Sequence, residues 1–386
     1  MKNNFDYSRS KGVNMAKKSK YYSLDNILKE KATYNLIIGE RSNGKTFAVD
    51  DYGLKAYCDF GYQMALIRRY ELDYTGKRGS VMFDAIVENG LVEKYSNGKW
   101  NNITYRASRW YLSKYDENLD KNICDETPFC YGFSLNAGEH DKSTSYPKIK
   151  TILFDEFLTR NGYLNDEFVL FMNTLSTIIR QRDDVKIFMC ANTVNKYAPY
   201  FTEMGLTNVE NMKQGTIDVY RYGNSELTVA IEYCASNKEG KKSDKYFAFN
   251  NPKLQMITGG AWEISLYPHL PTKYTTKDVK LTYYIEFGKN ILQCEIIRKK
   301  DDKNRKCAFT YIHRKTTPLK NEKNDIIFSQ NHNPSPNWFR KLGKPTTPLE
   351  KRLFNFFIQE KVFYQDNEVG EIMRNYLQWC VTDKII

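Results

Sequence analysis

The sequence predicts an α/β protein in which helices cover both faces of a parallel sheet, followed by a second, smaller domain. Three observations support this fold class. Short apolar runs alternate with helical segments through the first half of the chain, which is typical of strand–helix–strand units. Residues 39–46 form a phosphate-loop motif directly after one such run, at 36–38. With 386 residues, the chain is also longer than one ordinary domain.

The composition indicates a folded, basic protein. Hydrophobic residues make up 41% of the chain and aromatic residues 15%, which is enough for packed cores and excludes wholesale disorder. The net charge of +12 favours an anionic polymer or surface as partner, although lysine-rich surfaces that bind nothing are also common. The eight cysteines form no C-x-x-C pair and only four histidines are present, which argues against a structural zinc site. No apolar run reaches the length of a membrane span, so we expect a soluble intracellular protein without a membrane partner.

The motif at 39–46 reads G-x-x-x-x-G-K-T. Backbone N–H groups of such a turn close on a polyphosphate only where side chains do not intervene, so Gly39 and Gly44 are expected at the tight points. A helix starting near Lys45 points its positive dipole end at the same anion. Lys45 can reach the β and γ oxygens, and the Thr46 hydroxyl can bind Mg²⁺. A chance glycine–lysine turn is the alternative, but the preceding strand makes a nucleoside triphosphate site the better interpretation.

A helix is predicted at 47–60, with Gly61 as its stop, and a strand follows at 62–67. Arg68 and Arg69 come directly after that strand. At the carboxyl end of a strand in an α/β sheet, side chains lie on the ligand face. A surface ion pair explains the two arginines equally well.

Two adjacent acids follow the next buried strand. Residues 147–154 are largely apolar and lead directly into Asp155 and Glu156. Consecutive strand residues point to opposite faces, so the two carboxylates can take different roles. Asp155 is expected to hold the Mg²⁺ shell, and Glu156 to orient and deprotonate the water that attacks the γ-phosphate. Without the upstream loop, such a pair would usually be a helix cap or a solvated turn.

An amphipathic helix is predicted at 166–182, because its apolar residues recur every three or four positions. Arg180 and Arg182 in its last turn suit the helix dipole. On spacing alone, this interaction with the helix dipole is the preferred interpretation. The alternative is an arginine that reaches the nucleotide of a neighbouring subunit. A fourth strand at 185–191 ends at Asn192, which is placed to sense the γ-phosphate, with a simple turn former as the alternative.

The remaining segments are predicted to be mainly antiparallel. Residues 72–145 form an insertion beside the parallel sheet, with a β-hairpin at 92–105 built on the Asn97-Gly98 turn. A lysine-rich stretch at 237–245 is a candidate linker. Further strands are predicted at 226–234, 261–267, 279–287, 291–299 and 306–314, and helices within 349–380.

Taken together, these motifs resemble the DNA-packaging ATPases of small tailed bacteriophages of the phi29 type. The resemblance lies in motifs that occur in the same order and cover most of residues 30–205. It is much fainter in the C-terminal half. The similar stretches are 35–39, 44–46, 66–70, 146–157, 180–185 and 192–201.

The resemblance implies a P-loop ATPase domain of the additional-strand type, a small linker and an RNase H-like C-terminal domain. The corresponding boundaries are a basic flexible leader at 1–30, the ATPase domain at 31–225, the linker region at 226–250 and a vestigial nuclease domain at 251–386. Nuclease activity is not expected, because Glu286 is the one acid found near the start of an RNase H-like site, and two-metal cleavage needs a carboxylate cluster.

The implied function is ATP-driven movement of double-stranded DNA into a preformed prohead. Such proteins work as a homo-oligomeric ring, usually of five subunits, at the prohead portal in the host cytoplasm, with ATP and Mg²⁺ as cofactors. Whether a packaging RNA takes part is left open. The alternatives are a full terminase with an active nuclease domain, and a nucleotide-gated DNA-binding scaffold with negligible ATPase activity.

The resemblance also assigns roles to single residues of the nucleotide site. Lys45 and Thr46 become the phosphate and Mg²⁺ ligands, Asp155 the metal-positioning acid and Glu156 the catalytic glutamate. Arg41 matches a loop arginine that is common among phage packaging ATPases.

Other implied roles concern neighbouring subunits and DNA. Arg180 falls at the position of a trans-acting arginine finger, which reverses the preference given above. Lys142 falls at a lysine thought to act between subunits, and Arg182 and Asn192 are candidates for coupling. Arg68 and Arg69 are candidates for DNA contact, although Glu71 follows them where a base is expected.

Overall fold

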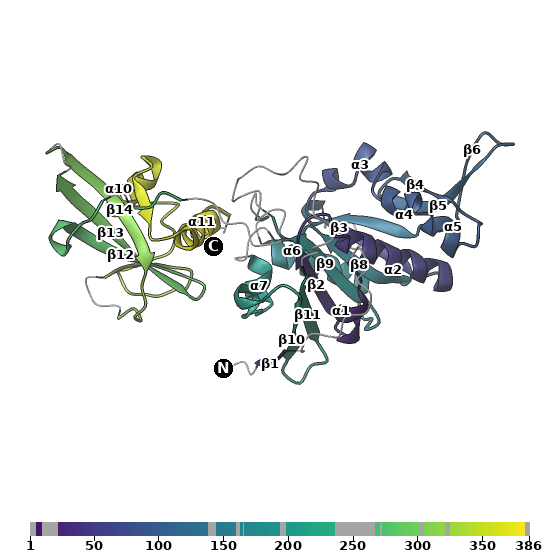
Figure 1. Ribbon diagram of the computed structural model, residues 1–386, viewed down its shortest axis with the longest axis horizontal. Coiled ribbons are helices and arrows are strands. Elements are labelled where there is room, and N and C mark those ends of the chain that lie inside the picture. The colour runs from purple at the N-terminus through teal and green to yellow at the C-terminus, as the bar shows by residue number, and fades with distance from the viewer. Residues whose placement is uncertain are drawn as a thin grey trace. The chain divides into compact units, whose positions relative to one another are not determined.

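The computed structural model divides into two compact units, Met1–Glu263 and Ile264–Ile386, which are described separately (Figure 1). Among the described residues, no helix is long and apolar enough to cross a membrane. The described residues are 5–9, 22–137, 144–159, 163–164, 166–193, 198–235, 267–270, 272–300, 304–320 and 325–382.

The first unit is built on a sheet that has 11 strands within the described residues. Six neighbouring strands, from β11 through β2, β9, β8 and β3 to β7, are parallel, and antiparallel strands extend both edges. The predicted α/β fold class is therefore confirmed. In sheet order the strands are β1 (Phe5–Arg9), β10 (Thr216–Tyr222), β11 (Thr228–Tyr233), β2 (Tyr34–Gly39), β9 (Lys186–Asn192), β8 (Ile149–Asp155), β3 (Gln63–Arg68), β7 (Cys130–Ser134), β5 (Arg109–Asp116) and β4 (Asn102–Arg106), with β6 (Lys121–Cys124) paired to β5.

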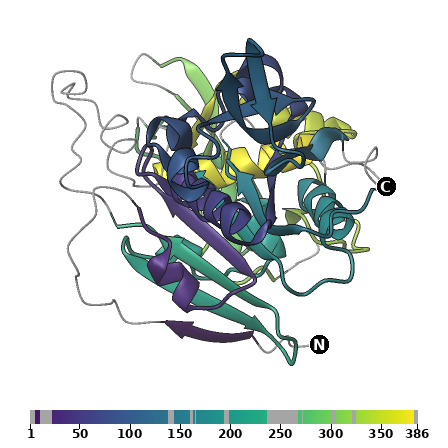
Figure 2. The ribbon, with the colours of Figure 1, turned by 90° about the vertical axis from the view of Figure 1, so that its right-hand side faces the viewer.

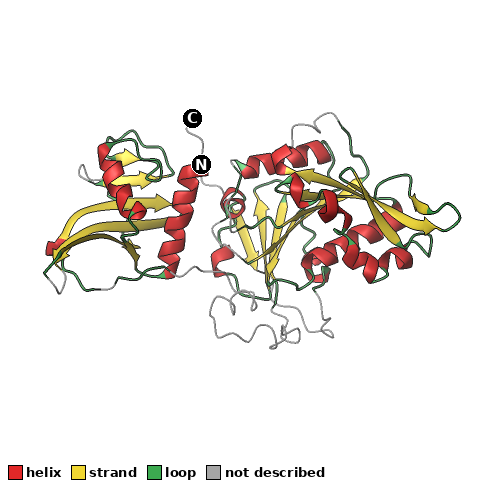
Figure 3. Cartoon of the chain, turned by 90° about the horizontal axis from the view of Figure 1, so that it is seen from above, coloured by secondary structure: helices red, strands yellow, loops and turns green. Residues whose placement is uncertain are grey.

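Helices cover both faces of this sheet (Figure 3). The long helix after the phosphate loop ends at Gly61, whose φ of 71° is left-handed, as expected for a glycine stop. The helices are α1 (Asp25–Lys29), α2 (Lys45–Phe60), α3 (Gly76–Ser80), α4 (Asp84–Glu88), α5 (Leu91–Tyr95), α6 (Glu167–Ile179) and α7 (Pro199–Glu203), with 3₁₀ turns η1 (Glu71–Asp73), η2 (Leu135–Ala137) and η3 (Val209–Asn211).

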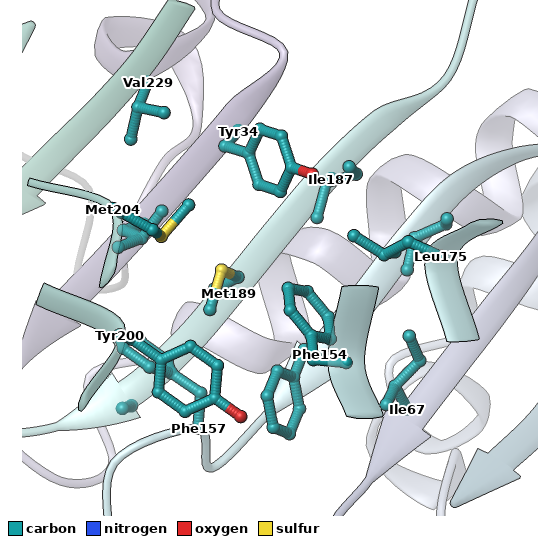
Figure 4. Close-up of a cluster of buried hydrophobic side chains, with 14 of the residues drawn as sticks. Tyr34, Ile67, Phe154, Phe157, Leu175, Ile187, Met189, Tyr200, Met204 and Val229 are labelled. Carbon is teal, nitrogen blue, oxygen red and sulfur yellow. The ribbon is translucent and has the colours of Figure 1, made fainter. Parts of the chain in front are cut away.

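Two hydrophobic cores result, because alternate residues of each buried strand point to opposite faces. In β2, Leu36 and Ile38 join the core beneath α6 and α7, whereas Ile37 joins the core beneath α1 and α2. Figure 4 shows the first of these cores, where Phe154 of β8 and Tyr200 of α7 lie at an edge-to-face angle of 70°. Hydrophobic cores thus pack on both faces of the sheet, and they set the positions of the ends of its central strands.

The predicted hairpin at 92–105 is wrong in its first half. Residues 91–95 form helix α5, and the sheet resumes only at β4. Val92 is completely buried against the core that includes α2, while Glu93 and Lys94 are exposed. Val92, together with the partly buried Leu91 and Tyr95, packs on the core that includes α2, and this burial favours a helix over the predicted hairpin strand.

The strand predicted at 226–234 is confirmed, and the linker region predicted at 226–250 is therefore wrong for these residues. Residues 228–233 form β11, which is paired in parallel with β2 and is almost entirely buried. Within the predicted flexible leader at 1–30, β1 pairs with β10 (Figure 2), and helix α1 buries Ile27. Residues 5–9 and 228–233 thus extend the sheet, and residues 25–29 cover its face.

The second unit contains a mixed sheet, in the order β16-β15-β12-β13-β14-β17. Three long antiparallel strands form its centre, and a parallel strand flanks them on each side. Of the predicted strand at 261–267, only Tyr267 is described, and it is not in a strand. The elements are η5 (Thr276–Asp278), β12 (Val279–Phe287), β13 (Asn290–Lys300), β14 (Lys306–Arg314), β15 (Ile326–Ser329), β16 (Trp338–Phe339), α10 (Pro348–Ile358), β17 (Val362–Tyr364) and α11 (Asn367–Thr382).

Candidate functional site

The candidate site lies at the carboxyl edge of the parallel strands in the first unit. Three strands, β2, β9 and β8, are parallel neighbours in register. Their carboxyl ends therefore bring together the phosphate loop, Asn192, and the acids Asp155 and Glu156. In open α/β sheets this edge is the usual place for ligands. The order β2-β9-β8 therefore brings together motifs that are far apart in the sequence.

The two glycines of the phosphate loop are needed for different reasons, Gly44 for its backbone conformation and Gly39 for close packing. Gly44, directly before α2, has a φ of 90°, a left-handed value that side chains disfavour. Gly39 has no such φ, but a Cβ there would lie 2.9 Å from the Cβ of Cys234, the residue after β11. The first glycine thus permits close contact with β11, and the second permits the turn into the helix.

The Lys45 side chain is buried within this loop, at 5% exposure. Its Nζ donates to the carbonyl of Glu40 at 2.7 Å and to Oδ1 of Asn43 at 3.0 Å, and lies 3.5 Å from Oδ1 of Asn192. Burial lowers the pKa of Lys45 from its ordinary value. An ammonium group is thus held where the loop and the start of α2 would meet a phosphate, and Asn192 lies beside it.

Thr46 and Asp155 form a pair of oxygen ligands. The Thr46 hydroxyl donates to Oδ1 of Asp155 at 3.0 Å. A hydroxyl and a carboxylate are donors that Mg²⁺ prefers, with phosphate and water completing its octahedral shell. The donor set therefore fits a Mg²⁺–nucleotide complex.

Arg68 spans the two acids after β8. Its Nη1 donates to Oδ2 of Asp155 at 2.7 Å, and its Nη2 lies 3.6 Å from the Glu156 carboxylate. The Arg68 side chain is only 14% exposed, whereas that of Glu156 is 64% exposed. The predicted DNA contact at Arg68 is therefore not supported, because this side chain is used within the site.

Arg69 is a structural residue. Its Nε and Nη2 each donate to a carboxylate oxygen of Glu167 at 2.7 Å, and Nη2 also donates to the carbonyl of Phe157 at 2.9 Å. Glu167 accepts a third side-chain bond from the Tyr200 hydroxyl at 2.7 Å. Because the Arg69–Glu167 pair is buried, the DNA-binding role predicted for Arg69 is wrong. The pair fixes the segment after β8 against the start of α6.

The two arginines after α6 differ in their surroundings. Arg182 donates to the carbonyls of Pro147 and Ile149 and to two carbonyls at the end of α6. Its side chain therefore joins α6 to the start of β8. Arg180 is exposed and donates to the carbonyl of Thr144 at 2.8 Å.

Both arginines lie at the amino end of β8, whereas Asp155 lies at its carboxyl end. Seven strand residues span roughly 20 Å, so Arg180 is far from the site of its own chain. Arg41 lies exposed in the phosphate loop. Lys142 falls outside the described residues.

Sequence reasoning missed a buried carboxylate beside the phosphate loop. Glu232 of β11 accepts a 2.7 Å hydrogen bond from the Tyr22 hydroxyl, and the backbone N–H of Tyr22 donates to the carbonyl of Asn43 in the loop. Burial raises the pKa of Glu232 to about 7. The signal for this residue was a single acid within the otherwise apolar run at 229–233.

The Glu232 carboxyl is expected to make the stability of the first unit depend on pH. In the folded chain it stays protonated up to about pH 7, whereas in the unfolded chain it ionises near its ordinary value of 4.5. The unfolded state therefore holds fewer protons in this range, and rising pH favours unfolding by about 3 kcal/mol in all. The unfolding midpoint of Glu232→Gln should fall less between pH 5 and pH 8 than that of the wild type. Parallel curves would show that Glu232 does not titrate in this way.

In the second unit, Glu286 accepts hydrogen bonds from Ser329 Oγ at 2.5 Å and from Asn331 Nδ2 at 3.2 Å. Within the described parts of the chain, no three or more His, Cys, Asp or Glu side chains are grouped so that they could hold a metal ion. The described contacts of Glu286 are thus with neutral side chains.

Comparisons with known proteins agree with the motifs of the first unit. Residues 121–245 match the family model of the podovirus DNA encapsidation protein, Gp16. The DNA packaging protein of Bacillus phage phi29 is 24% identical over 225 residues, and that of Bacillus phage B103 is 27% identical over 175 residues. The phi29 match covers 58% of this chain and 60% of that protein, and the B103 match covers 45% and 48%.

Two solved structures are similar over nearly the whole chain. The Phi-28 gp11 DNA packaging motor has a TM-score of 0.53 at 19% identity, over 95% of this chain and 100% of that one. The phi29 viral genome packaging motor assembly has a TM-score of 0.52 at 16% identity, over 92% and 97%. At these identities the likeness concerns the fold. In sequence over much of the first unit, and in fold over most of its length, the chain resembles the DNA packaging proteins of phi29-type bacteriophages.

Proposed function

We propose that this chain hydrolyses ATP and uses the reaction to drive double-stranded DNA into a viral prohead, as one subunit of a ring at the portal. The observation that carries the proposal is the convergence of Lys45, Thr46, Asp155 and Glu156 at one sheet edge. Its partners are suggested by the similarity to DNA packaging proteins. The net charge of +12 suits a ligand made of phosphates.

The loop and the start of α2 would hold the triphosphate. Gly44 allows the turn that directs backbone N–H groups inward, and the first turn of the 16-residue helix α2 adds its dipole. Lys45 already presents its ammonium group inside the loop. Thr46 and Asp155 would bind Mg²⁺, which neutralises charge that develops on the phosphates during transfer.

Glu156 is the residue suited to act on water. It follows the metal-binding acid directly, its side chain is 64% exposed, and its φ of 58° turns the chain out of the sheet. An exposed carboxylate is free to accept a hydrogen bond from a water molecule placed in line with the γ-phosphate. In this assignment Asp155 holds the metal, and Glu156 orients the nucleophile and accepts its proton.

Arg180 would act on the nucleotide of a neighbouring subunit. It is exposed and lies at the opposite end of β8 from the site of its own chain, so a catalytic contact requires a second copy. A guanidinium supplied in trans stabilises charge in the transition state of phosphoryl transfer. We infer a ring from this requirement. Five subunits is the number that the resemblance to phi29-type packaging ATPases implies, and the same resemblance admits a packaging RNA as a further partner.

Mixed rings test the role of Arg180. Arg180→Ala chains and Glu156→Gln chains should each hydrolyse ATP poorly on their own. When they are mixed, interfaces that pair an intact Glu156 with an intact Arg180 form again, so turnover should partly recover. The Lys148→Ala variant serves as control, because Lys148 is an exposed base near the same end of β8. Normal turnover by assembled Arg180→Ala rings would remove this residue from the mechanism.

The function as a whole is tested by packaging. Purified chain, proheads with their portal, double-stranded DNA and Mg²⁺·ATP should give DNA that is protected from added nuclease, and omission of ATP should abolish the protection. ATP binding without turnover under these conditions would instead identify a nucleotide-gated scaffold. Metal-dependent cutting of plasmid DNA would indicate a full terminase.

A further inference from the structure

A second buried acid lies behind the candidate nucleotide site. Asp50 is one helical turn after Thr46 on α2, so the two side chains share a face of the helix. This residue is only 7% exposed, and α2 packs there against β8 and β9. Among the described residues, its carboxylate has no hydrogen bond and no ion pair within 4.0 Å. A buried carboxyl group that lacks a hydrogen-bond partner is destabilising, so we looked for a role for it.

Thr46 donates to Asp155, and Asp155 pairs with Arg68, so the face of α2 that carries Thr46 and Asp50 is directed at this ion pair. Burial raises the pKa of Asp50 well above its ordinary range, the negative charge of Asp155 raises it further, and the positive charge of Arg68 lowers it. Asp155 and Arg68 are the same two groups that form the 2.7 Å ion pair at the end of β8. Asp50 thus lies on the side of α2 that faces this ion pair, and both groups of the pair act on it.

Arg68 has donor capacity left over. Its two terminal nitrogens face Asp155 and Glu156, but its Nε is buried without a hydrogen-bond partner. A guanidinium has five N–H donors in a fixed plane, so Arg68 can bind a further carboxylate with donors that are not used here. Asp50 is a nearby carboxylate with acceptor capacity to spare.

The ion pair and a bound cation compete for the same carboxylate. Asp155 now accepts from Thr46 on one oxygen and from Arg68 on the other. Mg²⁺ held by Thr46 and Asp155 would share the Asp155 carboxylate with the Arg68 guanidinium. The two positive charges on one carboxylate would then repel each other. Arg68 therefore needs another acceptor when the cation binds.

We propose that Asp50 is this acceptor: when a Mg²⁺–nucleotide complex occupies Thr46 and Asp155, Arg68 turns from Asp155 to Asp50. Asp50 is then a positioning residue, which acts through Arg68 and touches neither nucleotide nor metal. The proposal rests on the nucleotide site proposed above and adds a residue that its motifs do not contain. It makes the Mg²⁺ dependence of nucleotide binding the property that Asp50 controls.

Calorimetric titration of the full-length chain with ADP tests this role, once with excess Mg²⁺ and once with EDTA. Asn has the shape of the carboxyl group without its charge, so Asp50→Asn should bind ADP normally in EDTA. Its gain in affinity from Mg²⁺ should be roughly tenfold smaller, the loss expected for one charged hydrogen bond. Asp51→Asn is the matched control, because Asp51 is the next residue of α2 and accepts a bond from the Tyr95 hydroxyl instead.

A double-mutant cycle separates this role from a structural one. In an Arg68→Gln background, the change Asp50→Asn should cause no further loss of the gain in ADP affinity from Mg²⁺. With Arg68 intact, Asp50→Glu should retain more of this gain than Asp50→Asn does. Equal losses of affinity with and without Mg²⁺, or additive effects of the two changes, would overturn the proposal. If the wild-type chain bound no ADP, the nucleotide site itself would be refuted. If the wild-type chain bound ADP but Asp50→Asn and Asp51→Asn gained equally in affinity from Mg²⁺, only the role of Asp50 would be refuted.

Discussion

Replacing Glu156 with Gln is expected to lower ATP turnover by about 10²- to 10⁴-fold, the usual contribution of a general base. Gln can still accept a hydrogen bond from water but cannot take its proton. Nucleotide affinity should change little, because Glu156 is exposed and its nearest described charge is Arg68, at 3.6 Å. Turnover by the purified chain with proheads and DNA, measured beside ADP affinity, separates these two effects.

Glu71→Gln is the control for this substitution. Glu71 is also exposed and comes shortly after β3, whose carboxyl end lies beside that of β8. Its replacement should leave turnover unchanged. Normal ATP hydrolysis and prohead filling by the Glu156→Gln chain would end the catalytic assignment of Glu156.

Removing the carboxylate of Glu167 is expected to destabilise the first unit by about 3–5 kcal/mol, because the Arg69 guanidinium would stay buried without its counter-ion. The Glu167→Ala change also deprives the Tyr200 hydroxyl and the backbone N–H of Leu164 of their acceptor. The unfolding midpoint in urea, followed by tryptophan fluorescence and circular dichroism, measures the loss.

The exposed pair of Arg78 and Asp73 provides the comparison. The two groups are 4.0 Å apart, and the Arg78 side chain is 69% exposed. Arg78→Ala should therefore cost less than about 1 kcal/mol. If Glu167→Ala were no more destabilising than this surface change, the buried pair would not hold the segment after β8 against α6.

The local features of the nucleotide site could be predicted from the sequence. The glycine–lysine motif, the strand before it and the helix after it are contiguous, so short-range geometry decides them. The acids at 155 and 156 could be found in the same way, because an apolar strand that ends in two carboxylates is a local pattern. Parallel strands then place Asn192 at the same edge.

Features that depend on distant partners could not be predicted. Arg68 and Arg69 are adjacent in sequence, and nothing local distinguishes them, yet one faces the nucleotide site and the other pairs with a residue 98 positions away. Helix α5 formed against its hairpin signal because burial of Val92 outweighed turn propensity.

The sequence by itself determined the fold class and the phosphate loop with its acids, because these follow from contiguous residues and from the alternation of apolar strands and helices. Only the tertiary structure decided that residues 228–233 complete the central sheet, that Arg182 joins α6 to β8, and that Arg68 pairs with Asp155. The physical reason is the same in each case. A charged side chain or an unpaired strand edge is stabilised by the group that lies next to it in the folded chain. Packing of the whole unit decides which group that is, so short stretches of sequence do not reveal it.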